Sequence, residues 1–439
     1  MDAALGLDIG STNTKAVLTD PYRVLTAPTP TDPDELIGCA LRLAREAAHG
    51  VRVGAVGVAS MAETGVPLDR DLRPLTPLLR WDASRGDTDA RALSAELGAA
   101  AVFAATGVRL APKTPLSTWR WLRRTGTPMH RWAGVADLVA LALTGTLRTD
   151  HTLAGRTGAW RLAGGWDAGL LAAVGVEPQQ LPEVGGAAPL RAEAAAATGL
   201  RAGTPVLVAG HDHQVGAWAA GVRGPGAVAD SLGTAESLIR PTPWPAPEAV
   251  AAQGMSLVRT VGGHPALVAG SPAAGAVLDT WYAEHAGRDA DRDVSVPATP
   301  TGRPIRPYPR GRQCPRPDPT ATLVVPDGAD AASVYEGLAL HTRWMYQAQS
   351  ELALAGAAAP EVTVIGGHRR WVEFLAAVLP VPVRWVEARE PVATGAALLA
   401  AGDLVPLRSH PMGPRNPLYD KDFRDFLHGV SAGSWRTDR

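Results

Sequence analysis

The chain has 439 residues, which is long enough for two large domains. Hydrophobic residues make up 46% and charged residues 19%, a balance that excludes a disordered chain, and the net charge of −1 argues against a nucleic-acid-binding protein. No run of about 18 apolar residues occurs, so we expect no membrane association.

The cysteines and lysines are few and therefore informative. Cys39 and Cys314 cannot build a disulfide framework and lack metal-type spacing, so we expect ordinary thiols in a cytoplasmic protein without a targeting segment. Lysine occurs three times among 42 Lys and Arg residues, as Lys15, Lys113 and Lys421. In so arginine-rich a chain, a retained lysine suggests a position that needs a compact ammonium group.

The first half of the chain predicts a mixed α/β domain. Residues 3–9 and 14–18 flank the polar turn 10–13 and predict a β-hairpin. Residues 34–49 have apolar positions at helical spacing, and residues 51–59 form a buried strand. Residues 86–200 are predicted to be mostly helical, with three tryptophans as packing residues: Trp119, Trp121 and Trp132.

The stretch around Asp212 carries the strongest chemical signal. An apolar strand, 205–209, ends at Gly210, and an Ala-rich helix is predicted over 214–222. Asp212 therefore stands at the mouth of a strand-to-helix turn, where α/β sheets bind ligands and where a carboxylate can accept a proton from a bound hydroxyl. A simple helix N-cap is the alternative.

His211 and His213 also permit a metal interpretation of this stretch. In an extended segment their side chains alternate to one face and could chelate zinc. We disfavour this interpretation because no third ligand of suitable spacing is evident in the sequence.

The second half repeats the plan of the first. A turn cluster near 223–226 precedes a strand, a Gly-Thr turn and another strand over 227–237. Ser231-Leu232-Gly233-Thr234 thus echoes Asp8-Ile9-Gly10-Ser11-Thr12, and we expect two domains of common plan, 1–222 and 223–439. The remaining elements expected are an irregular excursion at 287–328, a helix at 331–354, a strand at 362–367, a helix at 369–379, a strand at 381–386 and a small-residue helix at 394–401. The last 30 or so residues show no clear pattern.

The two Gly-Thr turns have the chemistry of phosphate sites. Such turns direct backbone N–H groups toward one concavity, which suits phosphate oxygens, although either could be an ordinary turn. Asp8 is placed to hold magnesium through water. Gly366-Gly367, before a helix, offers a helix N-terminus to a further phosphate or to a ribose–adenine group, or forms a tight strand–helix turn.

Taken in order, these stretches resemble the FGGY family of carbohydrate kinases. Residues 7–15 resemble its first phosphate motif, 210–212 its catalytic segment and 231–234 its second phosphate motif. Gly366-Gly367, with the later segment 390–397, resembles its adenosine motif. Trp81-Asp82-Ala83-Ser84-Arg85 is similar to a further family segment, so the resemblance covers roughly residues 4–402.

The resemblance implies a fold and a reaction. The fold would be α/β, with two actin-like (ribonuclease H-like) domains of mixed sheet flanked by helices, and with ATP and substrate in the cleft between them. The reaction would be ATP-dependent phosphorylation of a hydroxyl on a sugar, polyol or related small molecule. Asp212 would be the general base and Mg²⁺-ATP the donor. Neither nucleic acid nor membrane would be a partner, and a homodimer is left open.

It also implies roles for particular residues. Asp8 would hold Mg²⁺, and the acceptor would meet Glu63, Trp81, Lys113 and His213 beside Asp212. Lys113 follows Gly107 in a Thr-Gly-containing stretch, although a solvated loop lysine is the alternative. The ATP phosphates and nucleoside would contact Gly10, Ser11, Thr12, Asn13, Lys15, Gly233, Thr234, Gly366 and Gly367.

The chain departs from the family pattern at two places. Gly311-Arg312-Gln313-Cys314-Pro315 differs from the family's Gly-Glu-Arg-x-Pro segment, and His368-Arg369-Arg370 replaces small residues after the double glycine. These departures make one alternative credible, a kinase for a cyclitol or modified sugar. A second alternative is a non-catalytic nucleotide-binding module of actin-like fold, which would keep both hairpins but would not need an acid at position 212.

Overall fold

The computed structural model describes residues 2–285, 294–353 and 360–431. The chain forms two compact units. Unit 1 comprises Met1–Arg223, Ser256–Pro265 and Ala388–Leu407, and unit 2 comprises Gly224–Met255, Ala266–Glu387 and Arg408–Arg439. The first boundary between the units, after Arg223, lies one residue from the domain boundary expected between residues 222 and 223. The two later segments of unit 1 differ from the expectation of a continuous second domain over 223–439.

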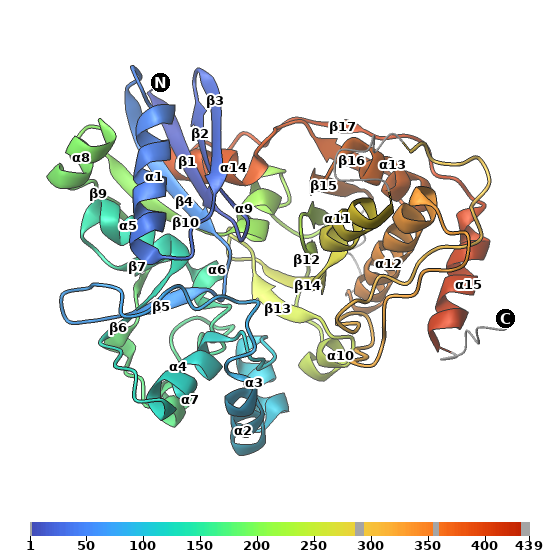
Figure 1. The fold of residues 1–439 in the computed structure, drawn as a ribbon, viewed down its shortest axis with the longest axis horizontal. Coiled ribbons are helices and arrows are strands. Elements are labelled where there is room, and N and C mark those ends of the chain that lie inside the picture. Colours follow the sequence, from blue (N-terminus) through green and yellow to red (C-terminus); the bar gives the residue numbers. More distant parts are fainter. Residues whose placement is uncertain (1, 286–293, 354–359, 432–439) are drawn as a thin grey trace. The chain divides into compact units, whose positions relative to one another are not determined.

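Unit 1 is built on a mixed sheet with strand order β3-β2-β1-β4-β10-β9 (Figure 1). β1 pairs antiparallel with β2, as the hairpin prediction requires, and parallel with β4, which in turn pairs parallel with β10. Its strands are β1 (Ala3–Ile9), β2 (Asn13–Thr19), β3 (Tyr22–Pro28), β4 (Val53–Ser60), β9 (Ala187–Pro189) and β10 (Pro205–His211).

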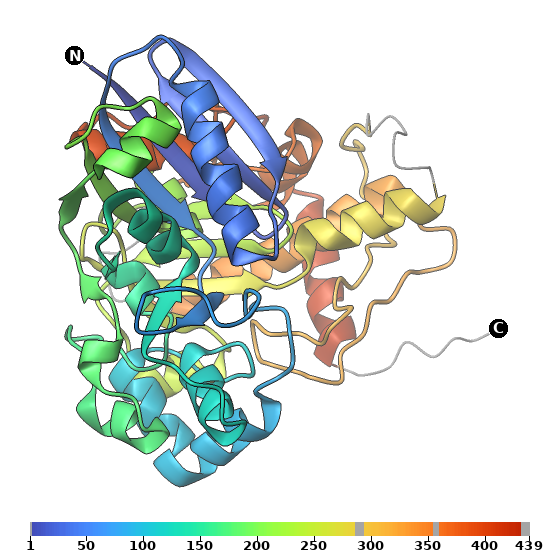
Figure 2. The ribbon, with the colours of Figure 1, turned by 60° about the vertical axis from the view of Figure 1, so that its left-hand side comes forward.

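The alternation of side chains along β1 explains how this sheet is covered. Successive residues of a strand point to opposite faces, so Leu5, Leu7 and Ile9 share one face. They lie in one buried cluster with Leu36 and Leu43 of helix α1 (Pro33–Ala47), and both ribbon views show α1 lying along this sheet (Figures 1 and 2). Asp32 caps α1 by accepting from two backbone N–H groups at its start, which fixes where the helix begins.

The opposite face carries helix α14 (Pro391–Ala401), which packs on β1, β4 and α9. Gly6 and Gly57 allow this approach. A Cβ atom on Gly6 would lie 1.7 Å from the carbonyl oxygen of Ala393, and one on Gly57 would lie 1.9 Å from that of Ala396. The predicted helix 394–401 is thus present, but it completes unit 1, because its small residues fit only where the strands carry no side chain.

The rest of unit 1 is mostly helical between residues 86 and 200, as expected. Trp119 and Trp132 are buried in an edge-to-face pair, and Trp121 packs against the same cluster. The helices are α2 (Asp87–Leu97), α3 (Ala99–Thr106), α4 (Pro115–Arg124), α5 (Val135–Thr144), α6 (His151–Ala154), α7 (Ala168–Val174), α8 (Ala192–Thr198) and α9 (Asp212–Ala219). Short strands accompany them, namely β5 (Gly65–Leu68), β6 (Arg131–Gly134), β7 (Arg148–Thr149), β8 (Glu183–Val184) and β13 (Ser256–Arg259), with a 3₁₀ turn at Pro178–Gln180.

Unit 2 repeats the hairpin arrangement. β11 pairs antiparallel with β12 and parallel with β15, just as β1 pairs with β2 and β4. The order β14-β12-β11-β15-β16-β17 therefore places a Gly-containing hairpin at the centre of each sheet. The strands are β11 (Ala229–Leu232), β12 (Glu236–Pro241), β14 (Pro265–Ser271), β15 (Val362–Gly366), β16 (Val383–Val386) and β17 (Ser409–Pro411).

Most predicted elements of unit 2 are confirmed, but several others were not predicted, namely β14, β17, α10 (Pro247–Ala252), α11 (Ala274–His285) and α15 (Tyr419–Ser431). The expected excursion 287–328 contains only isolated β-bridges in its described part, from residue 294, and residues 287–293 lie outside the description. The C-terminal region forms a helix that the sequence did not indicate. The remaining helices are α12 (Ala331–Leu352) and α13 (Arg369–Val378).

Two further expectations concern the whole chain. Both cysteines are free and buried, as expected for ordinary thiols. Within the described ranges, no helix is both long and apolar enough to cross a membrane.

The packing of α14 predicts a large difference between two Gly→Ala substitutions. Gly57→Ala should lower the free energy of unfolding by about 3 kcal/mol or more, because a methyl group has no space beside Ala396. Gly38→Ala is the control. This glycine is exposed within α1 with open space around it, so its substitution should raise stability by up to about 1 kcal/mol. Urea unfolding of both variants gives the comparison, and equal stabilities would contradict the packing argument.

Candidate active site

The site begins at the carboxyl end of β10, where the strand breaks register with β4 between Val208 and Gly210. Gly210 has φ of 130°, and a Cβ atom there would lie 2.5 Å from Thr152 Oγ1. Only glycine fits this close approach. The break turns the chain so that Asp212 becomes the first residue of α9, and the helix begins two residues before the expected 214.

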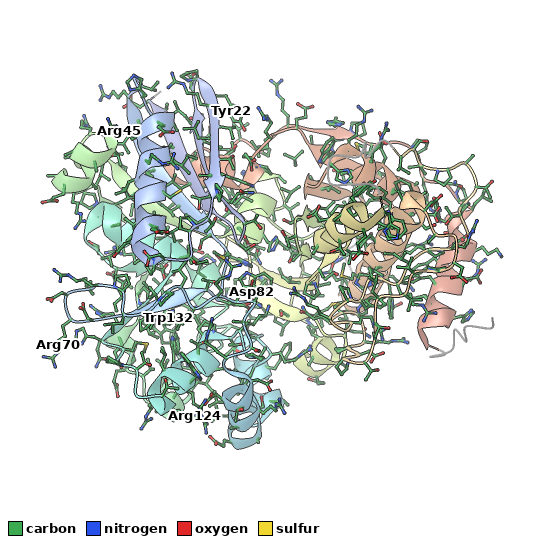
Figure 3. All side chains as sticks on the ribbon, in the orientation of Figure 1. Tyr22, Arg45, Arg70, Asp82, Arg124 and Trp132 are labelled. Carbon is green, nitrogen blue, oxygen red and sulfur yellow. The ribbon has the colours of Figure 1, made fainter. Side chains whose placement is uncertain are left out.

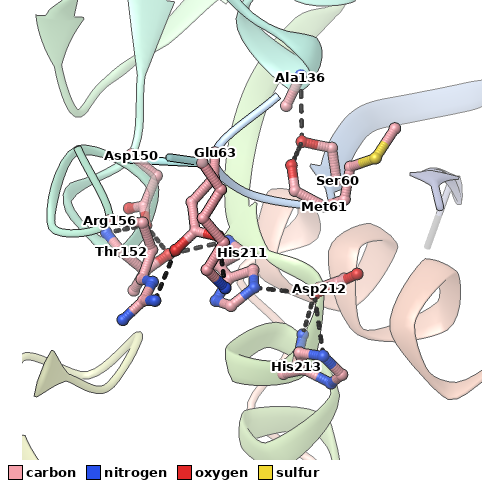
Figure 4. Close-up of polar contacts among 11 residues, drawn as sticks. Ser60, Met61, Glu63, Ala136, Asp150, Thr152, Arg156, His211, Asp212 and His213 are labelled. Carbon is pink, nitrogen blue, oxygen red and sulfur yellow. Dashed lines mark hydrogen bonds and ion pairs between the residues drawn. The ribbon is translucent and has the colours of Figure 1, made fainter. Parts of the chain in front are cut away.

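A short chain of hydrogen bonds holds this turn in place (Figure 4). The backbone N–H of His211 donates to Thr152 Oγ1 at 2.8 Å, and the Thr152 hydroxyl donates to Asp150 Oδ1 at 2.6 Å. Asp150 also caps α6 through the backbone N–H of Thr152 at 2.8 Å. The position of Asp212 is therefore fixed from the N-terminus of α6 as well as from β10.

Asp212 lies between two histidines with its carboxylate partly open to solvent, at 22% exposure (Figure 4). Its Oδ1 is 3.1 Å from His211 Nε2 and accepts from the His213 backbone N–H at 2.6 Å. The residue in the N-cap position of α9 is His211, so the N-cap interpretation of Asp212 is wrong.

Burial keeps His211 neutral. It lowers the pKa of His211 to about 4, because the imidazolium form would lose its hydration. Nδ1 of His211 is buried with no partner, which assigns the ring proton to Nε2, the atom that faces Asp212.

The His-Asp-His cluster meets one geometric requirement of a metal site. Ligand atoms of His211, Asp212 and His213 all lie within 4.8 Å of one another. Asp212 is thus the third ligand that the sequence interpretation did not find. With its proton on Nε2, His211 donates toward Asp212 from the same atom that a metal would need.

Glu63 follows β4 and pairs with two cationic side chains, Lys113 and Arg156. Its Oε2 lies 2.9 Å from Lys113 Nζ, and its Oε1 accepts from Arg156 at 2.6 Å. Burial would raise the pKa of Glu63, but Lys113 and Arg156 overcome this effect and lower it to about 2. Lys113 Nζ also stands 5.7 Å from the ring centroid of Trp81, so the structure brings Glu63, Trp81 and Lys113 together.

Asp8 and Lys15 face each other across the first hairpin, in register on β1 and β2. Lys15 Nζ is 3.8 Å from Asp8 Oδ2 and 2.7 Å from Glu390 Oε2, at the N-cap of α14. Burial raises the pKa of Asp8 to about 7, with Lys15 opposing this effect and Asp212 adding to it. Because Asp212 contributes, Asp8 and Asp212 share one electrostatic environment.

The turn residues of the first hairpin are partly accessible. Gly10 closes the turn by donating its N–H to Asn13 at 3.0 Å. Ser11 and Asn13 are half-buried and Thr12 is exposed at its tip.

The second hairpin gathers the glycines of unit 2. Gly233 closes its turn by donating to Ala235 at 2.9 Å, and Gly367 donates to the Leu232 carbonyl at 3.1 Å. A Cβ on Gly366 would lie 2.5 Å from the Leu232 oxygen, and one on Gly275 would lie 2.2 Å from the Gly233 oxygen. Gly275, near the start of α11, is a part of this cluster that the sequence analysis missed.

Comparisons with known proteins identify relatives of part of the chain. The model described as "FGGY family of carbohydrate kinases, N-terminal domain" matches residues 29–219. Gluconokinase of Bacillus subtilis (strain 168) is 26% identical over 203 residues, which is 41% of this chain and 39% of that protein. Over this segment the chain is similar to the FGGY family of carbohydrate kinases. The match spans about two fifths of the length of this curated relative.

Solved structures extend the likeness to nearly the whole chain. The xylulose kinase from Rhodospirillum rubrum has a TM-score of 0.83 at 25% identity and covers 98% of each chain. The gluconate kinase from Lactobacillus acidophilus has a TM-score of 0.84 at 18% identity and covers 98% of this chain and 97% of its own. The fold of the FGGY kinases, with two actin-like units, is therefore the fold of this chain.

Several residues of this site escaped the sequence analysis. Arg156 lies in a stretch that predicted only helix, and Asp150 precedes it by six residues with no motif. Glu390 was included in the adenosine-like segment, but it pairs with Lys15 within unit 1, and residues 393–397 are buried by packing. The signal for Arg156 is tertiary, because its partner Glu63 lies 93 positions away. Asp150 acts on His211 only through Thr152, which lies 59 positions from His211.

The hydrogen bonds at Thr152 predict a selective loss on Thr152→Val. Valine keeps the shape but leaves the partly buried His211 N–H without an acceptor, which should cost about 1–3 kcal/mol of stability. We also expect turnover to fall, because Asp212 loses one of its supports. Thr31→Val, at an exposed position, is the control. Unchanged stability and turnover in Thr152→Val would show that the turn does not depend on this hydroxyl.

The lowered pKa of His211 predicts its response to acid. The unfolded chain binds a proton near pH 6.5, whereas folded His211 does so only near pH 4, so its contribution to stability is lost as the pH falls through this window. Histidine ring carbons labelled with ¹³C should show a neutral His211 at pH 5.5, assigned with His211→Gln. A titration midpoint near 6.5 would overturn the assignment of a neutral imidazole.

Proposed function

We propose that the chain is an ATP-dependent kinase that phosphorylates a hydroxyl of a sugar, polyol or related polyhydroxylated small molecule. The observation that carries the proposal is Asp212, a partly exposed carboxylate at the carboxyl end of β10, fixed from two elements. In this proposal Asp212 accepts the proton of the acceptor hydroxyl. The family and the names of the relatives support this activity.

The residues near Asp212 fit a magnesium-bound triphosphate. Asp8 Oδ1 is buried without a hydrogen-bond partner, which suits a carboxylate that holds Mg²⁺ through water. Bound Mg²⁺ would neutralise phosphate charge and raise the electrophilicity of the γ-phosphorus. Burial opposes the ammonium form of Lys15, but Asp8 and Glu390 raise its pKa, so it stays charged beside the carboxylate.

The hairpin turns supply the phosphate contacts in this proposal. Their glycines leave the backbone open to a ligand, and backbone N–H groups in such turns bind anions. We assign the triphosphate to Gly10, Ser11, Thr12, Asn13 and Lys15 in unit 1 and to Gly233 and Thr234 in unit 2. Gly366 and Gly367, before α13, are assigned to the nucleoside end.

The acceptor side is assigned to the cluster around Glu63. Trp81 offers an apolar ring to a carbon skeleton, and Lys113 lies beside it. His213 Nε2 lies 4.0 Å from Asp212 Oδ1, and its ring packs edge to face against His211. Cytoplasmic location fits this soluble small-molecule chemistry and is part of the proposal.

The decisive test is Asp212→Asn. The amide keeps the shape but cannot take a proton, so kcat should fall by about 10² or more. ATP binding, measured by calorimetry, should change little. Asp34→Asn, at an exposed position in the first turn of α1, is the matched control and should keep full activity. A variant that retains more than about a tenth of wild-type kcat would contradict the assignment of the base.

A further inference from the structure

Both oxygens of Glu63 are already engaged within the protein. One accepts from Arg156 and the other pairs with Lys113, and the Glu63 side chain is only 6% exposed. The residue also has φ of 67°, a left-handed conformation that is uncommon for a residue other than glycine. Glu63 is thus turned inward to the cations, which differs from the expectation that the acceptor would meet it directly.

The accessible surface at this place consists of cationic donors. Lys113 is 33% exposed and Arg156 16% exposed, against 6% for Glu63 between them. An ammonium and a guanidinium carry eight N–H donors and no acceptor, and Glu63 has only two oxygens. Two positive charges and one negative charge leave this wall of three side chains with a net charge of +1.

A carboxylate is the group that complements such a wall. It offers only acceptor oxygens and one negative charge, so every contact with Lys113 or Arg156 becomes a charge-assisted hydrogen bond. A hydroxyl has one proton to donate, and neither of these two side chains can accept it. Neutral sugars therefore gain less here than a sugar acid of the same length.

His211 connects this wall to the base. In Figure 4, Glu63 and Arg156 lie on one side of His211 and Asp212 lies on the other. The charges of Arg156, Glu63 and Asp212 all act on the His211 ring. The Glu63–Arg156 pair and the Asp212 carboxylate are therefore both close to this ring. An acceptor that spans His211 would have one end at the cations and a distant hydroxyl at Asp212.

We propose that the acceptor is a polyhydroxylated carboxylic acid whose carboxylate binds Lys113 and Arg156, with the phosphorylated hydroxyl at the far end of its carbon chain. This inference rests on the proposed kinase function and adds the substrate class and the direction of binding. The γ-phosphorus forms a bond to the hydroxyl oxygen, its bond to the bridging oxygen of ADP breaks, and the hydroxyl proton passes to Asp212. Glu63 is a positioning residue, because it orders the two cations and does not contact the acceptor.

The test compares acceptors that differ at one end only. ADP release is measured with the complete chain on four- to six-carbon aldonates, their aldonamides and the corresponding alditols. D-Gluconate, D-gluconamide and D-glucitol form one such set. We expect kcat/KM for the preferred aldonate to exceed that of its amide and alditol by at least about tenfold, the usual weight of a charge-assisted hydrogen bond.

The variants assign that preference to the two cations. Lys113→Met and Arg156→Gln should each raise KM for the aldonate by about tenfold or more, with kcat and KM for ATP nearly unchanged. For both variants kcat/KM should fall more for the aldonate than for the alditol, so the acid-to-neutral ratio should drop by about tenfold. Lys421→Met, an exposed lysine on α15, and Arg70→Gln, an exposed loop arginine on the outer edge of unit 1, are matched controls (Figure 3).

The outcomes separate this inference from the proposed function. If an alditol or neutral sugar is turned over as well as the acid, and Lys113→Met leaves the acid-to-neutral ratio unchanged, the inference is wrong while the kinase assignment stands. If no acceptor of any class yields Asp212-dependent ADP release, the proposed function fails first. If a variant unfolds, binding of D-gluconate and D-glucitol to the wild type by calorimetry still decides the preference, and equal affinities would refute it.

Discussion

The close approach of α14 to the backbone of β1 and β4 is the constraint on which the site in unit 1 depends. Because Gly6 and Gly57 carry no side chain, the helix lies directly on the strands, and its first turn reaches the end of the hairpin. Glu390 then stands beside Lys15, and Lys15 beside Asp8. If side chains on β1 and β4 held α14 farther from the sheet, Glu390 would no longer reach Lys15.

The same sheet edge organises the rest of the site by a second principle. β1, β4 and β10 are parallel neighbours, so their carboxyl ends meet at one edge, and Asp8, Glu63 and Asp212 come from these three strands or the residues just after them. Each acid has a different electrostatic role. Asp8 is buried and resists ionisation, Glu63 is buried between two cations and stays ionised, and Asp212 remains partly exposed.

Much of the fold and part of the site could be predicted from the sequence. The hairpin turns, the strand before Asp212 and the glycine pair at 366–367 all depend on local patterns, and each is confirmed as an element. The return of 388–407 to unit 1 could not be predicted, because it depends on the fit between alanines of one segment and glycines of another. Arg156 was missed for a similar reason, since its partner Glu63 lies 93 residues earlier.

The discontinuity of unit 1 has a consequence for synthesis on the ribosome. When residues 1–223 have emerged, all strands of the sheet of unit 1 are present, yet the helix that covers Gly6 and Gly57 has not been made. About 180 more residues must be synthesised before α14 is complete, and until then one apolar face of the nascent sheet stays uncovered. Unit 2, inserted between the parts of unit 1, is translated almost entirely during that interval, so folding of the first half is tied to completion of the second.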